Sequence, residues 1–168
     1  MVYAGSIGMS PRLQGYVVPV LNSASLFGRV LPGALADKIG RFNMMIIMCC
    51  VTFIVIFAAW IPAKTNADVL VFAALYGFSS GAYVSIIGTL TAEITEDMSK
   101  IGLRNGLTFC IISIAALIGT PIGGQLLKAD DGKFLGLQLF AGLTLVVGTL
   151  LITACRIKVG GFKIVKRV

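Results

Sequence analysis

The sequence predicts an all-α, polytopic membrane protein. Three observations predict this class: an apolar composition, five long apolar segments, and an uneven distribution of Lys and Arg between those segments. The chain has 168 residues, of which 57% are hydrophobic and 12% are charged, whereas a soluble domain carries about 25% charged residues. A chain this apolar cannot cover itself with polar surface in water, so a lipid bilayer is the expected solvent.

The five apolar segments are each long enough to cross a hydrocarbon core of about 30 Å at about 1.5 Å rise per residue. In chain order they are residues 13–36, 42–62, 68–92, 103–127 and 134–155. The second and fifth contain no charge. The other three carry polar residues and glycines, which indicates that they face protein or a cavity instead of lipid.

Positive charge predicts the orientation of these segments. If all five cross the membrane, nine basic residues fall on one side, namely Lys38, Arg41, Lys100, Arg104, Arg156, Lys158, Lys163, Lys166 and Arg167. Four fall on the other, namely Arg12, Lys64, Lys128 and Lys133. Because cytoplasmic loops are enriched in Lys and Arg, we expect the first side, with the C-terminus, to be cytoplasmic. The expected location is a multi-pass position in the plasma membrane or an organelle membrane.

Several other classes of protein are disfavoured. The net charge of +7 is explained by cytoplasmic loops facing anionic lipid, and no basic stripe is interleaved with stacking aromatics, so no nucleic-acid partner is expected. The sequence has no histidine and no CxxC pair, so a metal site is not expected. No nucleophile, acid and base form a plausible catalytic set. We therefore predict no catalytic residue, no cofactor and no enzyme activity.

Glycine spacing predicts close helix packing at two places. Gly77 and Gly81 are four residues apart, as are Gly119 and Gly123, and such pairs let helix backbones approach closely. Ordinary packing is one interpretation, and helices that slide past one another along a substrate path are the other. Prolines inside the first and fourth segments would bend those helices.

The stretch "GALADKIGR", residues 33–41, resembles the G-x-x-x-D-[RK]-x-G-[RK] signature of the major facilitator superfamily. Together with "GRVLPG" and "GTPIGG" in the same order, it makes the chain similar to the C-terminal half of a fungal, monocarboxylate-transporter-like member. The resemblance implies one partial domain over 1–168, from the end of helix seven to helix twelve and a cytoplasmic tail. It also implies a missing N-terminal half, which would supply the other wall of the substrate cavity.

Arg29 is the sharpest candidate for substrate binding, because an arginine inside a span is costly unless it is paired or hydrated. A guanidinium binds a carboxylate bidentately, and the resemblance implies a role in substrate handling at this position. The alternatives are snorkelling to the interface or pairing with Asp37. Asn22, Ser25, Tyr83 and Ser85 are further candidates for lining a cavity, although side chains of these types more often serve local helix packing or bond to their own backbone.

The resemblance also implies a proton-coupling Asp where this chain has Ser25, so the coupling of a symporter is not carried over. Glu93 is the remaining carboxylate near the interior of a span, and a position at the interface explains it as well.

The loop at 33–41 is expected to act as a conformational latch. Gly33 and Gly40 would allow a close approach and a turn, and Asp37 would accept hydrogen bonds at the N-terminus of the next helix. With Lys38 and Arg41, the resemblance implies that this cluster holds the cytoplasmic side in one conformation. A role in topology alone is the alternative.

The function predicted from the sequence is secondary-active transport of a small, monocarboxylate-like organic anion by alternating access. The partners are the substrate, the lipid bilayer and the missing transporter half. A larger vitamin-like solute fits equally well. The alternative function is a non-transporting membrane fragment or scaffold derived from such a transporter.

Overall fold

The computed structural model describes residues 2–95 and 97–160, and its described part contains helices and no strand. This confirms the all-α prediction. The elements in chain order are α1 (Val2–Ser6), α2 (Pro11–Ile39), α3 (Arg41–Val55), the π-helical turn η1 (Ile56–Trp60), α4 (Asn66–Glu93), the 3₁₀ turn η2 (Met98–Lys100), α5 (Ile101–Ala129) and α6 (Leu135–Gly160).

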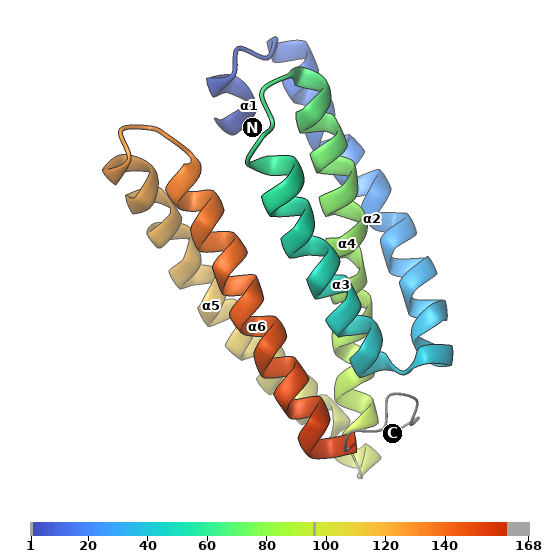
Figure 1. Ribbon diagram of the computed structural model, residues 1–168. Coiled ribbons are helices and arrows are strands. Elements are labelled where there is room, and N and C mark those ends of the chain that lie inside the picture. The colour runs from blue at the N-terminus through green and yellow to red at the C-terminus, as the bar shows by residue number, and fades with distance from the viewer. Residues whose placement is uncertain (1, 96, 161–168) are drawn as a thin grey trace.

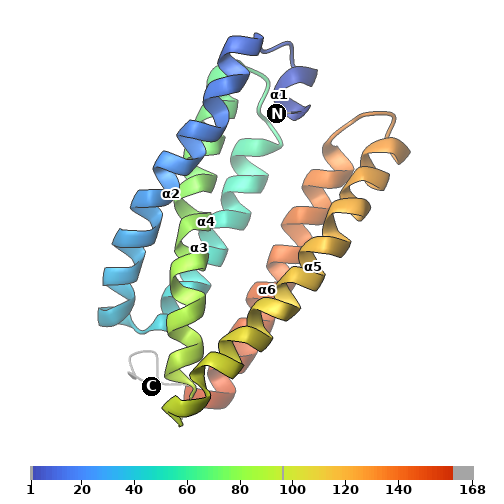
Figure 2. The ribbon, with the colours of Figure 1, turned by 180° about the vertical axis from the view of Figure 1, so that it is seen from behind.

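Five long helices, α2 to α6, run up and down the bundle in alternating directions (Figures 1 and 2). The turn at Gly40 and the segment joining α4 to α5 lie at the same end as the last turn of α6, whereas α1 and the other two connections lie at the opposite end. The connections therefore lie on the two sides that were assumed when Lys and Arg residues were counted for each side of the membrane. Lys163, Lys166 and Arg167 of that count lie outside the described residues.

Local sequence explains where the helices begin and end. Pro11 opens α2 at the first helical position, where its missing N–H costs nothing. Gly40 ends α2 with a φ of 98°, and its N–H donates to the carbonyl of Ala36 at 2.8 Å. Thr65 and Asp68 form a reciprocal capping box at the start of α4, which satisfies two backbone donors that the helix leaves free.

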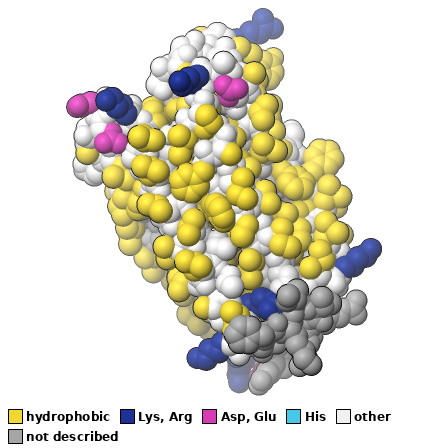
Figure 3. Space-filling model, in the orientation of Figure 1, with side chains coloured by type: hydrophobic (Ala, Val, Ile, Leu, Met, Phe, Trp, Pro, Cys, Tyr) yellow, Lys and Arg dark blue, Asp and Glu magenta, His cyan; other side chains and the backbone are white. Residues whose placement is uncertain are grey.

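Four segments are long and apolar enough to cross a membrane, judged by length and composition alone. They are Arg41–Trp60, Asn66–Glu93, Met98–Ala129 and Leu135–Lys158. The fifth helix, α2, has 29 residues but is not among them, because its polar residues and glycines lower its hydropathy. Its crossing of the membrane stays a prediction, supported by the way it lies alongside α4 (Figure 2). Figure 3 shows an apolar surface in the middle of the molecule and charged side chains at both ends.

A seam of small residues joins α2 to α4. A Cβ added to Gly77 or Gly81 of α4 would overlap the backbone carbonyl of Leu21 or Ser25 on α2, respectively. The predicted close packing at this pair is therefore confirmed. The second predicted pair is different: Gly119 has no atom within 4 Å of an added Cβ, whereas at Gly123 the added Cβ would lie 3.1 Å from Leu137. For Gly119 the prediction of close packing was wrong, because this residue faces the cavity described below.

Two clusters of buried apolar side chains hold the bundle together. The cluster nearer the Gly40 turn joins α2, α3 and α4 and consists of Ala36, Met44, Met45, Met48, Cys49, Ala82 and Ile86. The cluster at the other end, near α1, consists of Ala4, Met9, Ala63 and Val69. Between these two clusters the helices leave the space in which the candidate site lies.

The pair α5 and α6 lies to one side of α2, α3 and α4 (Figures 1 and 2). Helix α6 is attached to the α3–η1 segment, where the Gln138 side-chain amide donates to the Trp60 carbonyl at 3.2 Å and Arg156 donates to Asn43. None of the described residues of α5 is buried. The first turn of α5 is held by Arg104, whose guanidinium donates to the Ile94 carbonyl at 2.7 Å.

Candidate functional site

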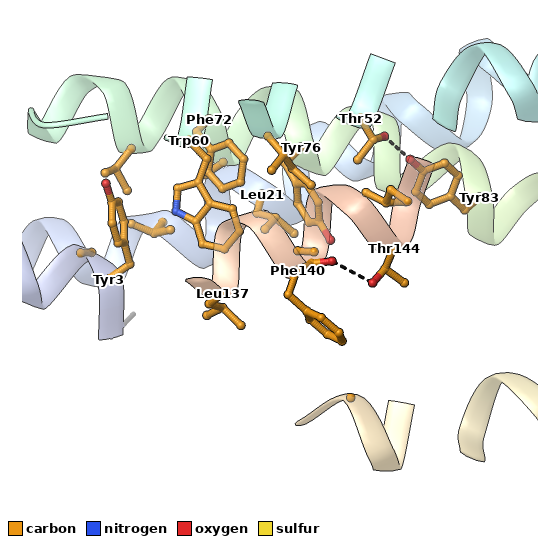
Figure 4. A pocket seen from close by; sticks show the side chains of 18 residues that line it. Tyr3, Leu21, Thr52, Trp60, Phe72, Tyr76, Tyr83, Leu137, Phe140 and Thr144 are labelled. Atoms are coloured by element: carbon orange, nitrogen blue, oxygen red, sulfur yellow. Dashed lines mark hydrogen bonds between the residues drawn. The ribbon is translucent and has the colours of Figure 1, made fainter. Parts of the chain in front are cut away.

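A cavity with a volume of about 550 Å³ lies between the helices of the bundle. Helices α4 and α6 supply most of its wall, and α1, α2, α3, η1 and α5 complete it (Figure 4). This volume falls in the range of sites that bury a drug-sized ligand, which is about 300 to 1,000 Å³. The lining residues used below are Tyr3, Thr52, Trp60, Phe72, Tyr76, Tyr83, Phe140 and Thr144. We call this space the aromatic cavity.

Aromatic rings form one end of the aromatic cavity. Trp60 and Phe72 are stacked, with ring centroids 5.1 Å apart and an interplanar angle of 18°. Tyr76 continues the row, with its ring centroid 5.5 Å from that of Phe72. Tyr3 meets Trp60 edge to face at 6.0 Å. Such pairs are stabilised beyond their buried area, and together they present flat, polarisable surfaces to the interior.

The hydroxyl groups of the cavity wall differ in whether they are already bonded. Tyr83 is hydrogen-bonded to the Thr52 hydroxyl and lies 3.2 Å from the Met48 carbonyl, and Tyr3 donates to the Ala63 carbonyl at 2.6 Å. Thr144 donates to the carbonyl of Phe140 on its own helix. The hydroxyl of Tyr76 makes no hydrogen bond to any residue that the structure describes, and Figure 4 shows it reaching from α4 toward α6.

The structure separates the residues that were predicted to bind substrate. Tyr83 lines the aromatic cavity, but its hydroxyl is already bonded to α3. Ser25 is buried in the seam against Gly81, and Ser85 donates to the backbone carbonyl of Arg29 at 3.0 Å. These contacts give both serines a packing role. Their contact with substrate stays a prediction.

Arg29 and Asn22 are exposed on α2 and do not line the aromatic cavity. They are seven residues apart, so they lie on the same face of the helix. No ion pair of Arg29 occurs within the described residues, and Asp37, its expected alternative partner, pairs with Arg41 instead. The exposed face of α2 is therefore a second place where a substrate or a partner could meet a charge.

Arg41 is the centre of the predicted latch. Its guanidinium donates to the Thr89 carbonyl near the end of α4 at 3.1 Å. The same group lies 3.7 Å from Asp37 and 4.0 Å from Glu93. The Glu93 side chain is only 12% exposed, and its Oε2 has no hydrogen-bond partner. The turn between α2 and α3 is thus attached to the end of α4 by one arginine.

Within the described residues, the other residues of the predicted latch do not bond to the end of α4 as Arg41 does. Gly40 forms the turn with its positive φ, as expected, and a Cβ added to Gly33 would lie 3.3 Å from the Ser85 hydroxyl. Lys38 is exposed. The prediction that Asp37 caps α3 was wrong: α2 continues through Ile39, so Asp37 lies in its last turn and Gly40 occupies the cap position without a side-chain bond.

A second arginine reinforces the same end of α4. Arg104, in the first turn of α5, donates to the Ile94 carbonyl directly after α4. Helix C-termini carry partial negative charge, so both guanidinium groups lie where a positive charge is favourable. In the adjoining loop, hydrogen bonds from Ser99 lower the pKa of Asp97 below its ordinary value. That carboxylate is therefore charged at neutral pH and pairs with Lys100 at 3.2 Å.

Sequence reasoning missed Trp60, Phe72 and Tyr76. The available signals were weak: Trp60 is the single tryptophan of the sequence, and Phe72 and Tyr76 are four residues apart, which places them on one helix face. Aromatic residues at this spacing are common in any apolar helix. That these rings surround a shared space becomes visible only in the structure, where α4 faces η1 and α6.

Comparison with known proteins agrees with this architecture. Residues 1–160 match the family described as Major Facilitator Superfamily. The chain is 46% identical over 165 residues to "MFS-type transporter 1" of Ophiocordyceps sp. (strain BCC 1869), covering 98% of this chain and 36% of that protein. It is 42% identical to "MFS transporter asaE" of Aspergillus flavus, covering 98% of this chain and 37% of the relative.

A third relative carries a more specific name. The chain is 42% identical over 148 residues to the "Fujikurins efflux protein" of Gibberella fujikuroi, covering 88% of this chain and 32% of that protein. The chain therefore spans about a third of the length of the curated relatives that it matches. No solved structure matches the chain.

Proposed function

Because the chain belongs to the Major Facilitator Superfamily, we propose that it forms part of a secondary transporter that moves a small organic molecule across a membrane by alternating access. The observation that carries this proposal is the aromatic cavity, a ligand-sized space lined mainly by α4 and α6, two of the helices long and apolar enough to cross a membrane. In transporters of this kind, one group of helices rocks against another around such a space.

We propose that the chain supplies one side of this transporter. By the family resemblance, 1–168 corresponds to the end of helix seven, helices eight to twelve and a cytoplasmic tail. The other side would come from the remaining two thirds of the length of the relatives. The exposed apolar surface of α5, on which Leu103, Ile111 and Leu117 are all more than half exposed, gives lipid or a second group of helices a large area to contact.

The proposed direction of transport is export. The basis is the printed name of one relative, an efflux protein for fujikurins. The substrate class is an organic molecule of secondary-metabolite size, larger than a simple monocarboxylate, because a cavity of about 550 Å³ would be mostly empty around a very small acid.

A small organic anion is the second candidate substrate. The observation that favours it is the exposed pair of Asn22 and Arg29 on one face of α2. If that face borders the substrate path in the completed transporter, Arg29 would bind a carboxylate. Arg29→Lys should then impair transport while insertion persists, because an ammonium cannot make the bidentate pair. Unchanged transport would remove Arg29 from the substrate site.

The cluster around Arg41 is proposed as the conformational latch. It ties the last turns of α2, which contain Gly33, Asp37 and Lys38, and the following turn at Gly40 to the end of α4. The greater number of basic residues at this end supports a cytoplasmic position for it.

Reconstitution tests the proposed transport. The chain is placed in proteoliposomes alone and together with the complementary N-terminal portion of a relative, and movement of a labelled secondary metabolite is measured. Transport only with the complementary portion is the expected result. No transport in either case would favour the alternative, a non-transporting fragment or scaffold.

A further inference from the structure

The aromatic cavity has a specific chemical character. Its wall contains the stacked pair Trp60 and Phe72 and the neighbouring ring of Tyr76 (Figure 4). Among the described residues that line it there is no Lys, Arg, Asp or Glu. A charged ligand placed there would lose its hydration without gaining a counter-ion, which is costly in an apolar environment. The cavity therefore disfavours the carboxylates expected from the sequence.

One hydroxyl group of the wall is available to a ligand. The hydroxyls of Tyr83, Tyr3 and Thr144 are engaged with Thr52 and with backbone carbonyls. The Tyr76 hydroxyl has no partner within the described residues. A phenol can donate one hydrogen bond and accept another, so this position can be satisfied by an alcohol, a phenol or a carbonyl on the ligand.

We propose that the aromatic cavity binds an uncharged, planar aromatic molecule with one hydrogen-bonding group. The molecule stacks on the outer face of the Trp60–Phe72 pair and forms a hydrogen bond with the Tyr76 hydroxyl. This inference rests on the proposed transport function for its biological meaning, since it names the chemical class of the substrate. Binding to the cavity is measured without transport, so the binding proposal and the transport proposal can fail independently.

Trp60 allows occupancy of the cavity to be measured directly. It is the single tryptophan of the sequence, so all tryptophan emission comes from the cavity wall. The full chain is placed in phosphatidylcholine nanodiscs and titrated with three anthracene probes that absorb this emission: anthracenemethanol, methylanthracene and anthracenecarboxylate. We expect saturable energy transfer, about fivefold tighter for the alcohol than for the methyl compound because of one hydrogen bond. The carboxylate should bind at least about a hundredfold more weakly.

Two tyrosine variants make a matched test of the polar contact. Tyr76→Phe should abolish the preference for the alcohol over the methyl compound. Tyr83→Phe should preserve it, because the Tyr83 hydroxyl is already bonded to Thr52. Both variants keep the ring and so disturb the packing little. Equal preferences in all three proteins would overturn the assignment of Tyr76, and tight binding of the carboxylate would overturn the uncharged class.

A relocated tryptophan controls for partition of the probes into lipid. Phe109 lies on α5 and is 51% exposed, so the double variant Trp60→Phe with Phe109→Trp reports on the lipid-facing surface. Saturable transfer from Trp60 but not from Trp at the new position supports the proposal. Identical transfer from both positions overturns it. Loss of binding when the complementary N-terminal portion is added would also overturn it, since protein would then fill the cavity.

Discussion

Gly28 on α2 lies directly against the carbonyl oxygen of Phe78 on α4, so closely that a Cβ at Gly28 would overlap that oxygen. The two helices run in the same direction and touch through their backbones. In a bilayer, where the lipid is as apolar as the side chains, such close packing is a main source of helix association. The position of α2, the most polar of the long helices, therefore depends on a residue without a side chain.

Replacing Gly28 by Ala should destabilise the bundle, because either α2 or α4 must move to make room for the methyl group. Overpacking of this kind costs about 1 to 3 kcal/mol. Unfolding in detergent, followed by circular dichroism during titration with sodium dodecyl sulfate, measures the loss.

Gly15 provides the matched control on the same helix. A Cβ there meets no atom within 4 Å, so Gly15→Ala should be neutral or slightly stabilising, since Ala is a better helix former than Gly. Equal losses from the two variants would mean that helix propensity, and not contact with α4, governs the effect.

The seam illustrates how far sequence reasoning reaches. The spacing of Gly77 and Gly81 predicted close packing correctly, because a small face on a membrane helix is visible in the sequence. The same spacing at Gly119 misled, because a pattern on one helix does not show what lies opposite. The positions of the five long helices, by contrast, follow from the lengths of the apolar segments alone.

The candidate site was harder to predict for a physical reason. Charged and polar residues in apolar segments, such as Arg29, attract attention because they are costly in a membrane. The aromatic cavity is formed by residues that cost nothing there, such as Trp60 and Phe72. Tyr83 and Tyr76 look alike in the sequence, and only the position of Thr52 shows that the hydroxyl of the first is already engaged.

Arg41→Gln should loosen the turn between α2 and α3 from the end of α4. The substitution removes the charge that faces Glu93 and Asp37 and weakens the donor to the Thr89 carbonyl. Hydrogen bonds to charged groups contribute about 1.5 to 3 kcal/mol, and the partial exposure of Arg41 places the expected loss near the lower limit. Lys38→Gln, at an exposed neighbouring position, should leave the free energy of unfolding unchanged.

Hydrogen exchange locates the effect of the Arg41 substitution. Faster exchange of the amides in the last turn of α4, with unchanged exchange near Thr65 at its other end, would place the loosening where the guanidinium binds. Uniformly faster exchange along α4 would instead indicate global destabilisation and would contradict a local clamp.

Thr65→Ala should destabilise the start of α4 by about 1 kcal/mol, because it removes one half of the capping box. Thr65 accepts from the Asp68 amide at 3.2 Å, and Asp68 accepts from the Thr65 amide at 2.9 Å. Asn66→Ala, at the first residue of α4, is the control and should have little effect. In a double-mutant cycle, Thr65→Ala and Asp68→Ala together should cost less than the sum of the two single losses. Additive losses would show that the two side chains act independently.

Cysteine labelling tests both the orientation of the chain and the crossing of α2. In a background without the native cysteines, Arg12→Cys and Lys38→Cys place one thiol near each end of α2. A membrane-impermeant maleimide should label the first in intact cells and the second only after permeabilisation, because the side with more basic residues is expected to be cytoplasmic.

Lys64→Cys and Lys100→Cys, which flank α4, are the reference pair, since α4 meets the length and apolarity expected of a span. Labelling of Arg12→Cys and Lys38→Cys from the same side would show that α2 does not cross the bilayer, whereas reversal of both pairs would place the arginine cluster around Arg41 outside the cytoplasm.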